Sequence, residues 1–201
     1  KLCATCMERE VYFDKGYSCC QYGAHARAII FAYKYGDKPY IAHHISEAML
    51  DRLKLALPWE WDLISFVPTE KDKAKERGFD HAQLLAELLS KDLGLPEKKM
   101  LVRKKKTIPQ RGLTLFERQD NVRGAFEVVR KDFGAAKSFG LMPEQERIEQ
   151  AESLLQGKRV LLIDDIFTTG STINECARVL KAAGARGVDF ATFAATANRH
   201  Y

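Results

Sequence analysis

Several features of other protein classes are missing from this chain of 201 residues. It has no apolar run long enough to cross a membrane and no basic-then-apolar segment typical of a secretory signal. It also lacks the Gly-Lys-Ser/Thr sequence of a Walker nucleotide-binding loop, internal repeats and low-complexity tracts. We therefore expect a cytoplasmic α/β protein without membrane insertion.

The cysteines do not form the even set that a disulfide framework requires. There are five of them, and an odd count with an early C-x-x-C is typical of thiols or metal ligands in a reducing compartment. Cys3 and Cys6 have the spacing of a zinc knuckle, but structural zinc needs four ligands. Cys19 and Cys20 are adjacent, which is not the usual second knuckle, so burial as small hydrophobes is the favoured interpretation for them, as it is for Cys176.

The composition is that of a globular domain with a mild basic excess. Hydrophobic residues make up 46% of the chain, enough for a sizeable core. The 32 lysines and arginines outnumber the 27 acidic residues, giving a net charge of +5. Such a charge is compatible with phosphate-bearing partners but does not require them.

Apolar periodicity and turn residues predict an alternation of strands and helices. Strands are expected at 62–67, 125–129, 159–163 and 188–193, and helices at 24–35, 39–55, 81–93, 144–155 and 171–183. The strand at 159–163 has no polar alternation, which is typical of a buried parallel strand. This order predicts a mainly parallel sheet flanked by helices over residues 23–201, with an insertion at 130–157. Residues 1–22 are expected to form a small cysteine-containing segment with a short strand or hairpin.

The most informative stretch is VLLIDDIFTTGST, residues 160–172. A buried strand leads to two adjacent carboxylates, Asp164 and Asp165, then to a turn and a helix. Gly170 lets a ligand approach the backbone closely. The turn also offers hydroxyl donors, namely Thr168, Thr169, Ser171 and Thr172.

This strand–turn–helix pattern favours the binding of a phosphorylated sugar. Backbone N–H groups and the dipole at a helix N-terminus bind a phosphate well. Two acidic residues beside an anion make sense if they accept hydrogen bonds from sugar hydroxyls, and ligands of parallel sheets lie at the carboxyl ends of the strands. The alternative is that Asp164 and Asp165 cap the helix while the hydroxyls fill a tight turn.

The same stretch closely resembles the phosphoribosyl-pyrophosphate (PRPP) motif of type I phosphoribosyltransferases. Residues 67–82 and 101–126 resemble two further segments of the ComF/GntX family of competence proteins. Asp80 and His81 stand where that family usually has Asn and Gln. The resemblance covers nearly the whole chain except about residues 130–157, and it implies the type I phosphoribosyltransferase fold.

The resemblance also implies particular site residues. PRPP would bind with Mg²⁺ on Asp164, Asp165 and the 168–172 turn, and a loop of Thr69, Glu70 and Lys71 would contact pyrophosphate. Glu70 is an unexpected residue for a pyrophosphate cradle. Asp164, Asp165 and Arg103 would be catalytic, the last within a basic run at 103–106 that lies where relatives have a loop closing over the ligand. Contact with DNA, or a solvated charged loop, remain alternatives for that run.

The amino-terminal cysteines and the biological role also follow from the resemblance. Cys3 and Cys6 look like the downstream half of a zinc ribbon, and because the chain begins with Lys1 the other half is expected upstream. The implied role is in DNA uptake during natural transformation, with PRPP or ribose 5-phosphate, single-stranded DNA and DNA-uptake proteins as partners. A nucleobase-salvage phosphoribosyltransferase and a non-catalytic PRPP sensor that binds single-stranded DNA are the alternatives.

Overall fold

The structure is a computed structural model. It describes residues 10–36, 38–56, 60–70, 72, 74, 78–104, 117, 121–129 and 153–196. No helix in these ranges is long and apolar enough to cross a membrane.

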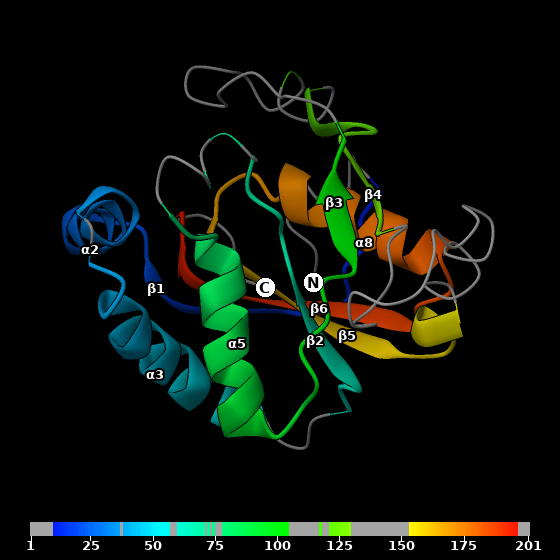
Figure 1. The fold of residues 1–201 in the computed structure, drawn as a ribbon, viewed down its shortest axis with the longest axis horizontal. Helices are drawn as coiled ribbons and strands as arrows, with labels where there is room; N and C mark the ends of the chain where they lie inside the picture. The colour runs from blue at the N-terminus through cyan, green and yellow to red at the C-terminus, as the bar shows by residue number, and fades with distance from the viewer. Residues whose placement is uncertain are drawn as a thin grey trace, which may run out of the picture.

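A four-stranded parallel sheet forms the centre of the molecule (Figure 1). Its strands lie in the order β1 (Gly16–Gln21), β6 (Gly187–Ala195), β5 (Arg159–Phe167) and β2 (Leu63–Phe66). The two central strands pair over almost their whole length, from Arg159 opposite Gly187 to Phe167 opposite Ala195. The predicted parallel sheet is therefore confirmed.

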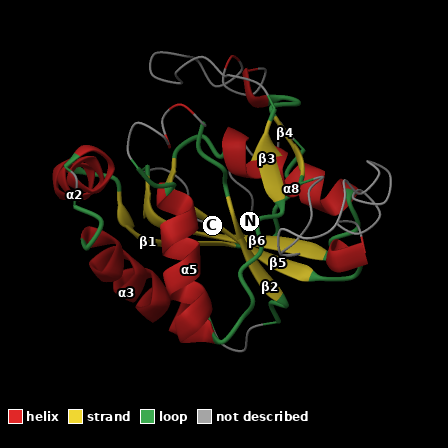
Figure 2. Cartoon of the chain, viewed as in Figure 1, coloured by secondary structure: helices red, strands yellow, loops and turns green. Residues whose placement is uncertain are grey.

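Helices cover both faces of the sheet (Figure 2). One face carries α2 (Ala24–Tyr35), α3 (Ile41–Lys54) and α5 (His81–Leu93). The other carries α8 (Ser171–Ala182) and an antiparallel pair, β3 (Leu101–Arg103) with β4 (Phe126–Val128). Because both faces are covered, successive residues of β5 enter two different cores: Val160 and Leu162 pack under α8, and Leu161 and Ile163 pack under α5.

Asp80 caps the start of α5, where the loop after β2 ends. The Asp80 carboxylate accepts hydrogen bonds from the backbone N–H groups of Ala82 and Gln83, which the first turn of a helix leaves unpaired. Gly94 ends the helix in the left-handed region, with φ 65°. The helix predicted at 81–93 is thus confirmed at both ends.

Two expectations need correction. β5 does not end at residue 163 but continues to Phe167, so Asp164 and Asp165 belong to the strand itself. Arg103 is the last residue of β3 and pairs with Phe126, so it does not lie in a loop. Cross-strand pairing with β4 provides the backbone partners that fix it in the strand.

The division of the chain at residue 22 stays a prediction. Residues 16–21 of the predicted cysteine-containing segment form β1 and join the main sheet, whereas residues 1–9 lie outside the described ranges. Most of the predicted insertion at 130–157 also lies outside them; within it only 153–157 are described.

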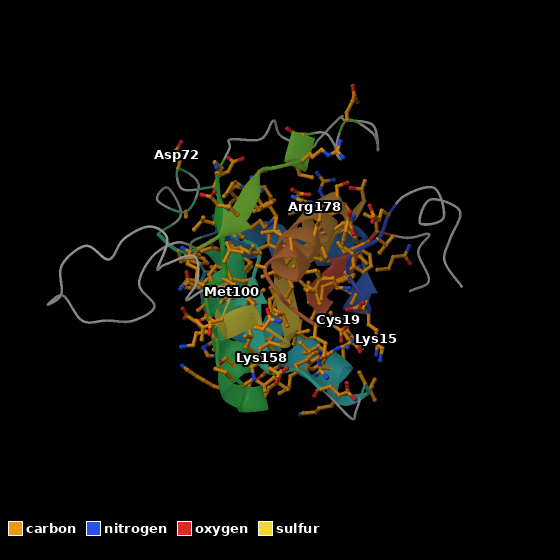
Figure 3. All side chains as sticks on the ribbon, turned by 90° about the vertical axis from the view of Figure 1, so that its right-hand side faces the viewer. Lys15, Cys19, Asp72, Met100, Lys158 and Arg178 are labelled. Carbon is orange, nitrogen blue, oxygen red and sulfur yellow. The ribbon has the colours of Figure 1, made fainter. Side chains whose placement is uncertain are left out.

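The carboxyl ends of the four strands meet at one edge of the sheet because the strands are parallel. Figure 3 marks the two edges: Lys15 and Lys158, which precede β1 and β5, lie below Asp72, which follows β2. At the carboxyl edge β1 passes into α2 within two residues, β5 passes into α8, and the loop after β2 leads to α5. This edge therefore brings together the predicted site residues and the start of α2.

Candidate functional site

The turn between β5 and α8 has the backbone shape that an anion site needs. Gly170 is the residue before the helix and adopts φ 75° and ψ 2°, in the left-handed region that favours glycine. Because Gly170 has no side chain, nothing at that position caps the first backbone N–H groups of α8. The Thr169 and Ser171 hydroxyls lie 3.0 Å apart beside it. The predicted phosphate-binding residues 168–172 thus form one turn at the start of α8.

This turn is held in place by the neighbouring strand. The backbone N–H of Thr196, just after β6, donates to the carbonyl of Phe167 at 2.9 Å. Its hydroxyl donates to the Thr168 carbonyl at 3.1 Å. Such contacts fix the turn before any ligand arrives, which lowers the entropy cost of binding.

The two aspartates that precede the turn have opposite electrostatic properties. Burial, the neighbouring Asp165 carboxylate and hydrogen bonding between the two side chains raise the pKa of Asp164 well above its ordinary value. Burial alone would also raise the pKa of Asp165, but the charge and hydrogen bond of Lys34 outweigh it and hold that pKa below the ordinary value. The pKa values of the two adjacent carboxyls therefore move in opposite directions.

Lys34 is a site residue that sequence reasoning missed. Its Nζ forms an ion pair with Asp165 Oδ2, and the two side chains are 24% and 10% exposed. Lys34 lies in the last turn of α2, the helix that follows β1 at the carboxyl edge of the sheet. No motif marks it; a lysine on a helix that also carries His25 and Arg27 looks like any solvated charge.

An ion pair with Arg103 explains the acidic residue, Glu70, in the predicted pyrophosphate loop. Glu70 Oε1 is 3.0 Å from an Arg103 guanidinium nitrogen, and both side chains are only 16% exposed. The guanidinium also lies 4.9 Å from the centre of the Phe126 ring. Glu70 thus carries its own counterion, supplied by the residue predicted to be catalytic.

Thr69 is held by the helix cap described above. Its backbone N–H and its hydroxyl both donate to the Asp80 carboxylate, at 2.9 and 3.1 Å. The same carboxylate therefore fixes the start of α5 and the start of the loop. Lys71 lies outside the described residues.

A cavity of about 470 Å³ opens between this loop, α5 and β3. Two cations, Lys99 and Arg103, line it together with the polar residues Thr69, Asp80 and Gln83. The cavity adjoins the predicted pyrophosphate loop and has the mixed lining of polar and apolar groups that is common in small-molecule sites.

The described cysteines, Cys19, Cys20 and Cys176, are free thiols. Burial raises the pKa of Cys19 to about 12, and its thiol donates to the Thr192 carbonyl at 3.6 Å. Cys176 is buried as expected, whereas Cys20 is exposed, so burial was the wrong interpretation for Cys20. Within the described residues no three His, Cys, Asp or Glu side chains cluster as a metal site. Cys3 and Cys6 lie outside those residues, and zinc there stays a prediction.

Comparison with known proteins agrees with this geometry. Residues 107–201 match the family model described as the phosphoribosyl transferase domain. The chain is 27% identical over 190 residues to competence protein F of Haemophilus influenzae, covering 90% of this chain and 73% of that protein. It is 25% identical over 194 residues to the DNA utilization protein YhgH of Escherichia coli, with 92% and 74% covered.

Solved structures resemble the chain more distantly. The glutamine PRPP amidotransferase from B. subtilis gives a TM-score of 0.45 at 18% identity over 76% of this chain. The chain spans about a quarter (26%) of the length of that amidotransferase. The protein TT1426 from Thermus thermophilus gives a TM-score of 0.38 at 12% identity, with 75% of this chain and 72% of that chain covered.

The parallel sheet and the strand–turn–helix site have the type I phosphoribosyltransferase fold, and residues 107–201 are similar to the phosphoribosyl transferase domain. Within that class the ComF resemblance is confirmed. The chain is similar to competence protein F of Haemophilus influenzae over nine-tenths of its length.

Proposed function

We propose that this protein binds PRPP at the carboxyl edge of its sheet and serves DNA uptake in the cytoplasm. The observation that carries the proposal is the turn from β5 to α8, where Gly170 adopts φ 75° and no side chain at that position covers the helix N-terminus. The 168–172 turn would hold the 5-phosphate, and Asp164 and Asp165 would bind the ribose hydroxyls. The competence and DNA utilization names of the relatives support the role in DNA uptake.

The pyrophosphate would lie toward the loop after β2. Arg103 at the end of β3 and Lys99 in the adjoining cavity supply positive charge on that side. If the protein transfers a phosphoribosyl group, pyrophosphate leaves the anomeric carbon and an acceptor takes its place. These cations would then stabilise the charge that develops on the leaving group, while the protein does little covalent work.

Magnesium fits this site as part of the ligand. Mg²⁺ takes oxygen ligands and is commonly held by one or two carboxylates together with substrate phosphates. The described residues contain no ready-made cluster of metal ligands, so the oxygens of PRPP would supply most of the coordination sphere. When bound, the ion neutralises part of the charge of the pyrophosphate.

Thermal unfolding with and without ligand tests the proposal. PRPP with Mg²⁺ should raise the melting temperature, because a ligand bound only by the folded state stabilises it by about 2.7 kcal/mol at a hundredfold excess over Kd. Ribose 5-phosphate should give a smaller rise, and ribose without phosphate none. No rise with millimolar PRPP would overturn the proposal. Pyrophosphate release with a panel of nucleobases separates a salvage enzyme from a binding protein.

Single-stranded DNA is a second candidate ligand, and a surface of α2 favours it. Phe31 and Tyr35 are 64% and 60% exposed, and their ring centres are 5.0 Å apart. Arg27 is exposed one helical turn before Phe31. Aromatic rings beside cations are the usual platform on which unpaired bases stack. The basic run offers less in the described residues, where Lys104 pairs with Glu127 at 3.1 Å.

Fluorescence anisotropy with a labelled oligothymidylate tests this second candidate. Phe31→Ala should weaken binding by roughly tenfold, since stacking on one ring is worth about 1–3 kcal/mol. Leu55→Ala is the matched control, because Leu55 is 80% exposed but lies at the far end of α3. Affinity should fall steeply as salt rises. Equal losses in the two variants would remove α2 as the DNA surface.

A further inference from the structure

The ion pair between Glu70 and Arg103 joins two segments that are each anchored by other contacts. On one side, the backbone N–H and the hydroxyl of Thr69 donate to Asp80, which ties the residue beside Glu70 to the start of α5. On the other side, Arg103 ends β3 opposite Phe126, and its guanidinium lies 4.9 Å from the centre of that ring. Both charged side chains therefore extend from fixed backbone toward one another.

The pair is also largely withdrawn from water. Each side chain is only 16% exposed, and Glu70 Oε1 lies 3.0 Å from a guanidinium nitrogen of Arg103. A mostly buried charge that loses its partner keeps the desolvation cost and loses the attraction. An anionic ligand that takes over Arg103 must therefore offer the guanidinium more than the Glu70 carboxylate does.

The position of the pair decides which part of a ligand meets it. The 168–172 turn follows β5, the loop that holds Glu70 follows β2, and these two strands are hydrogen-bonded neighbours. A phosphate bound at the turn leaves Glu70 on Arg103. A ligand with a second charged group directed toward β2 meets the ion pair itself.

We propose that Glu70 is a specificity-determining residue, an internal anion that occupies Arg103 until a pyrophosphate group replaces it. The inference rests on the proposed binding of PRPP. PRPP gains Arg103 only at the expense of the ion pair, so the site distinguishes PRPP from ribose 5-phosphate less sharply than a free Arg103 would allow. Free pyrophosphate is released more readily for the same reason, because Glu70 competes for the same guanidinium.

Glu70→Gln tests the competition, since glutamine keeps the size of the side chain and removes its charge. PRPP and inorganic pyrophosphate should each bind about tenfold more tightly to the variant, while ribose 5-phosphate should change by less than about twofold. Titration calorimetry of the three ligands at the same pH and Mg²⁺ concentration measures the differences. PRPP binding that is unchanged or weaker would overturn the proposal, and so would an equal gain for ribose 5-phosphate.

Glu127→Gln is the matched control. It removes a carboxylate from the same pair of strands, where Glu127 pairs with Lys104 at 3.1 Å. It should change the affinity for PRPP by less than about twofold, because that ion pair is more exposed. A gain as large as that of Glu70→Gln would mean that the loss of any negative charge near these strands strengthens binding, which would contradict a specific role for Glu70.

A measurement on the parent protein does not depend on the folding of a variant. The side-chain nitrogen NMR signals of Arg103, identified by their loss in Arg103→Lys, should move when PRPP or inorganic pyrophosphate binds. They should stay in place with ribose 5-phosphate, which leaves the ion pair intact. Signals that stay in place with bound PRPP would overturn the exchange of partners.

The outcomes separate this inference from the proposed function. If the parent gives no heat and no thermal shift with PRPP, the proposed function fails, and the inference fails with it. If the parent binds PRPP but Glu70→Gln binds it no more tightly, or the Arg103 signals do not move, only the role of Glu70 fails. Circular dichroism and retained binding of inorganic phosphate establish that Glu70→Gln is folded with its 168–172 turn intact.

Discussion

Two buried carboxylates at opposite ends of the central strands differ in how completely the protein satisfies them. Asp189, near the start of β6, accepts from the Trp61 indole at 2.8 Å, from Arg159 at 3.2 and 3.3 Å, and from the Lys15 backbone at 3.1 Å. Asp165, toward the end of β5, is held by the ammonium of Lys34. Each oxygen of Asp189 has one rigid donor, the Trp61 indole or the Lys15 backbone N–H, besides the Arg159 side chain, whereas Asp165 is held by a long, flexible side chain.

The difference separates a structural charge from a binding charge. A buried carboxylate whose oxygens are all bound by rigid partners cannot exchange them for a ligand without breaking the fold. A carboxylate held by a flexible lysine can give that partner up, since the ammonium reaches water or the ligand at little cost. The carboxyl edge of a parallel sheet is also where ligands bind, so position and chemistry agree.

The largest expected effect is the loss of stability when Asp189 is changed. Asp189→Asn should lower the free energy of unfolding by about 3 kcal/mol, because it removes the nearer of the two acidic partners of the mostly buried Arg159 and leaves only Asp14, at 4.0 Å. Urea unfolding followed by circular dichroism measures the change. Asp51→Asn, at an exposed pair on α3, should change it by less than about 0.5 kcal/mol. A loss below about 1 kcal/mol for Asp189→Asn would mean that the contacts of Asp189 do not hold the fold together.

The next effect concerns the backbone of the phosphate turn. Gly170→Val should weaken the binding of inorganic phosphate by at least about a hundredfold, because a β-branched residue is strained at φ 75° and crowds the turn. Gly94→Val provides the control, since Gly94 has a similar φ of 65° with open space around it, far from the turn. Both variants should lose stability, but only the first should lose phosphate in calorimetric titration. If both retain phosphate, the amides of the turn do not bind it.

Asp165→Asn should weaken ligand binding and leave the stability nearly unchanged, whereas Asp189→Asn should mainly lower the stability. PRPP binding should weaken by one to two decades, at about 1.4 kcal/mol per decade, while the free energy of unfolding changes by less than about 1 kcal/mol. The fold tolerates the change because Lys34 is partly exposed and can turn to water. Inorganic phosphate should bind as in the parent. PRPP binding that is as tight as in the parent would make the aspartates structural caps.

The smallest effect is expected on the pyrophosphate side. Arg103→Met leaves the charge of Glu70 uncompensated beside the cavity, so PRPP should bind up to about tenfold more weakly, whereas ribose 5-phosphate should bind nearly unchanged. Competition between the two ligands in calorimetric titration measures the difference. Arg103→Lys should lose less, since it keeps the charge but not the planar contact with Phe126. Equal losses of both ligands would show that Arg103 acts through the β3–β4 pair rather than on pyrophosphate.

Local signals explain why much of the fold and part of the site could be predicted from the sequence. The cap at Asp80 and the left-handed Gly94 bound α5, and the run from residue 160 to 172 contains the phosphate turn in consecutive residues. Contacts between distant segments explain what could not be predicted. β1 is recognised as a sheet strand only through its pairing with β6, Lys34 only through the path of α2, and the role of Glu70 only through Arg103.

The pairing of β1 with β6 has a consequence for how the protein forms during synthesis. Gly16 lies opposite Phe190, so the first strand of the sheet waits for the last one before it has a neighbour. Because α2 follows β1, Lys34 takes its place beside Asp165 only after β6 has left the ribosome. Contacts of such long sequence separation form late and slowly. A partly synthesised chain would therefore carry the phosphate turn while Asp165 still lacked Lys34, and the complete site would appear in the last step of folding.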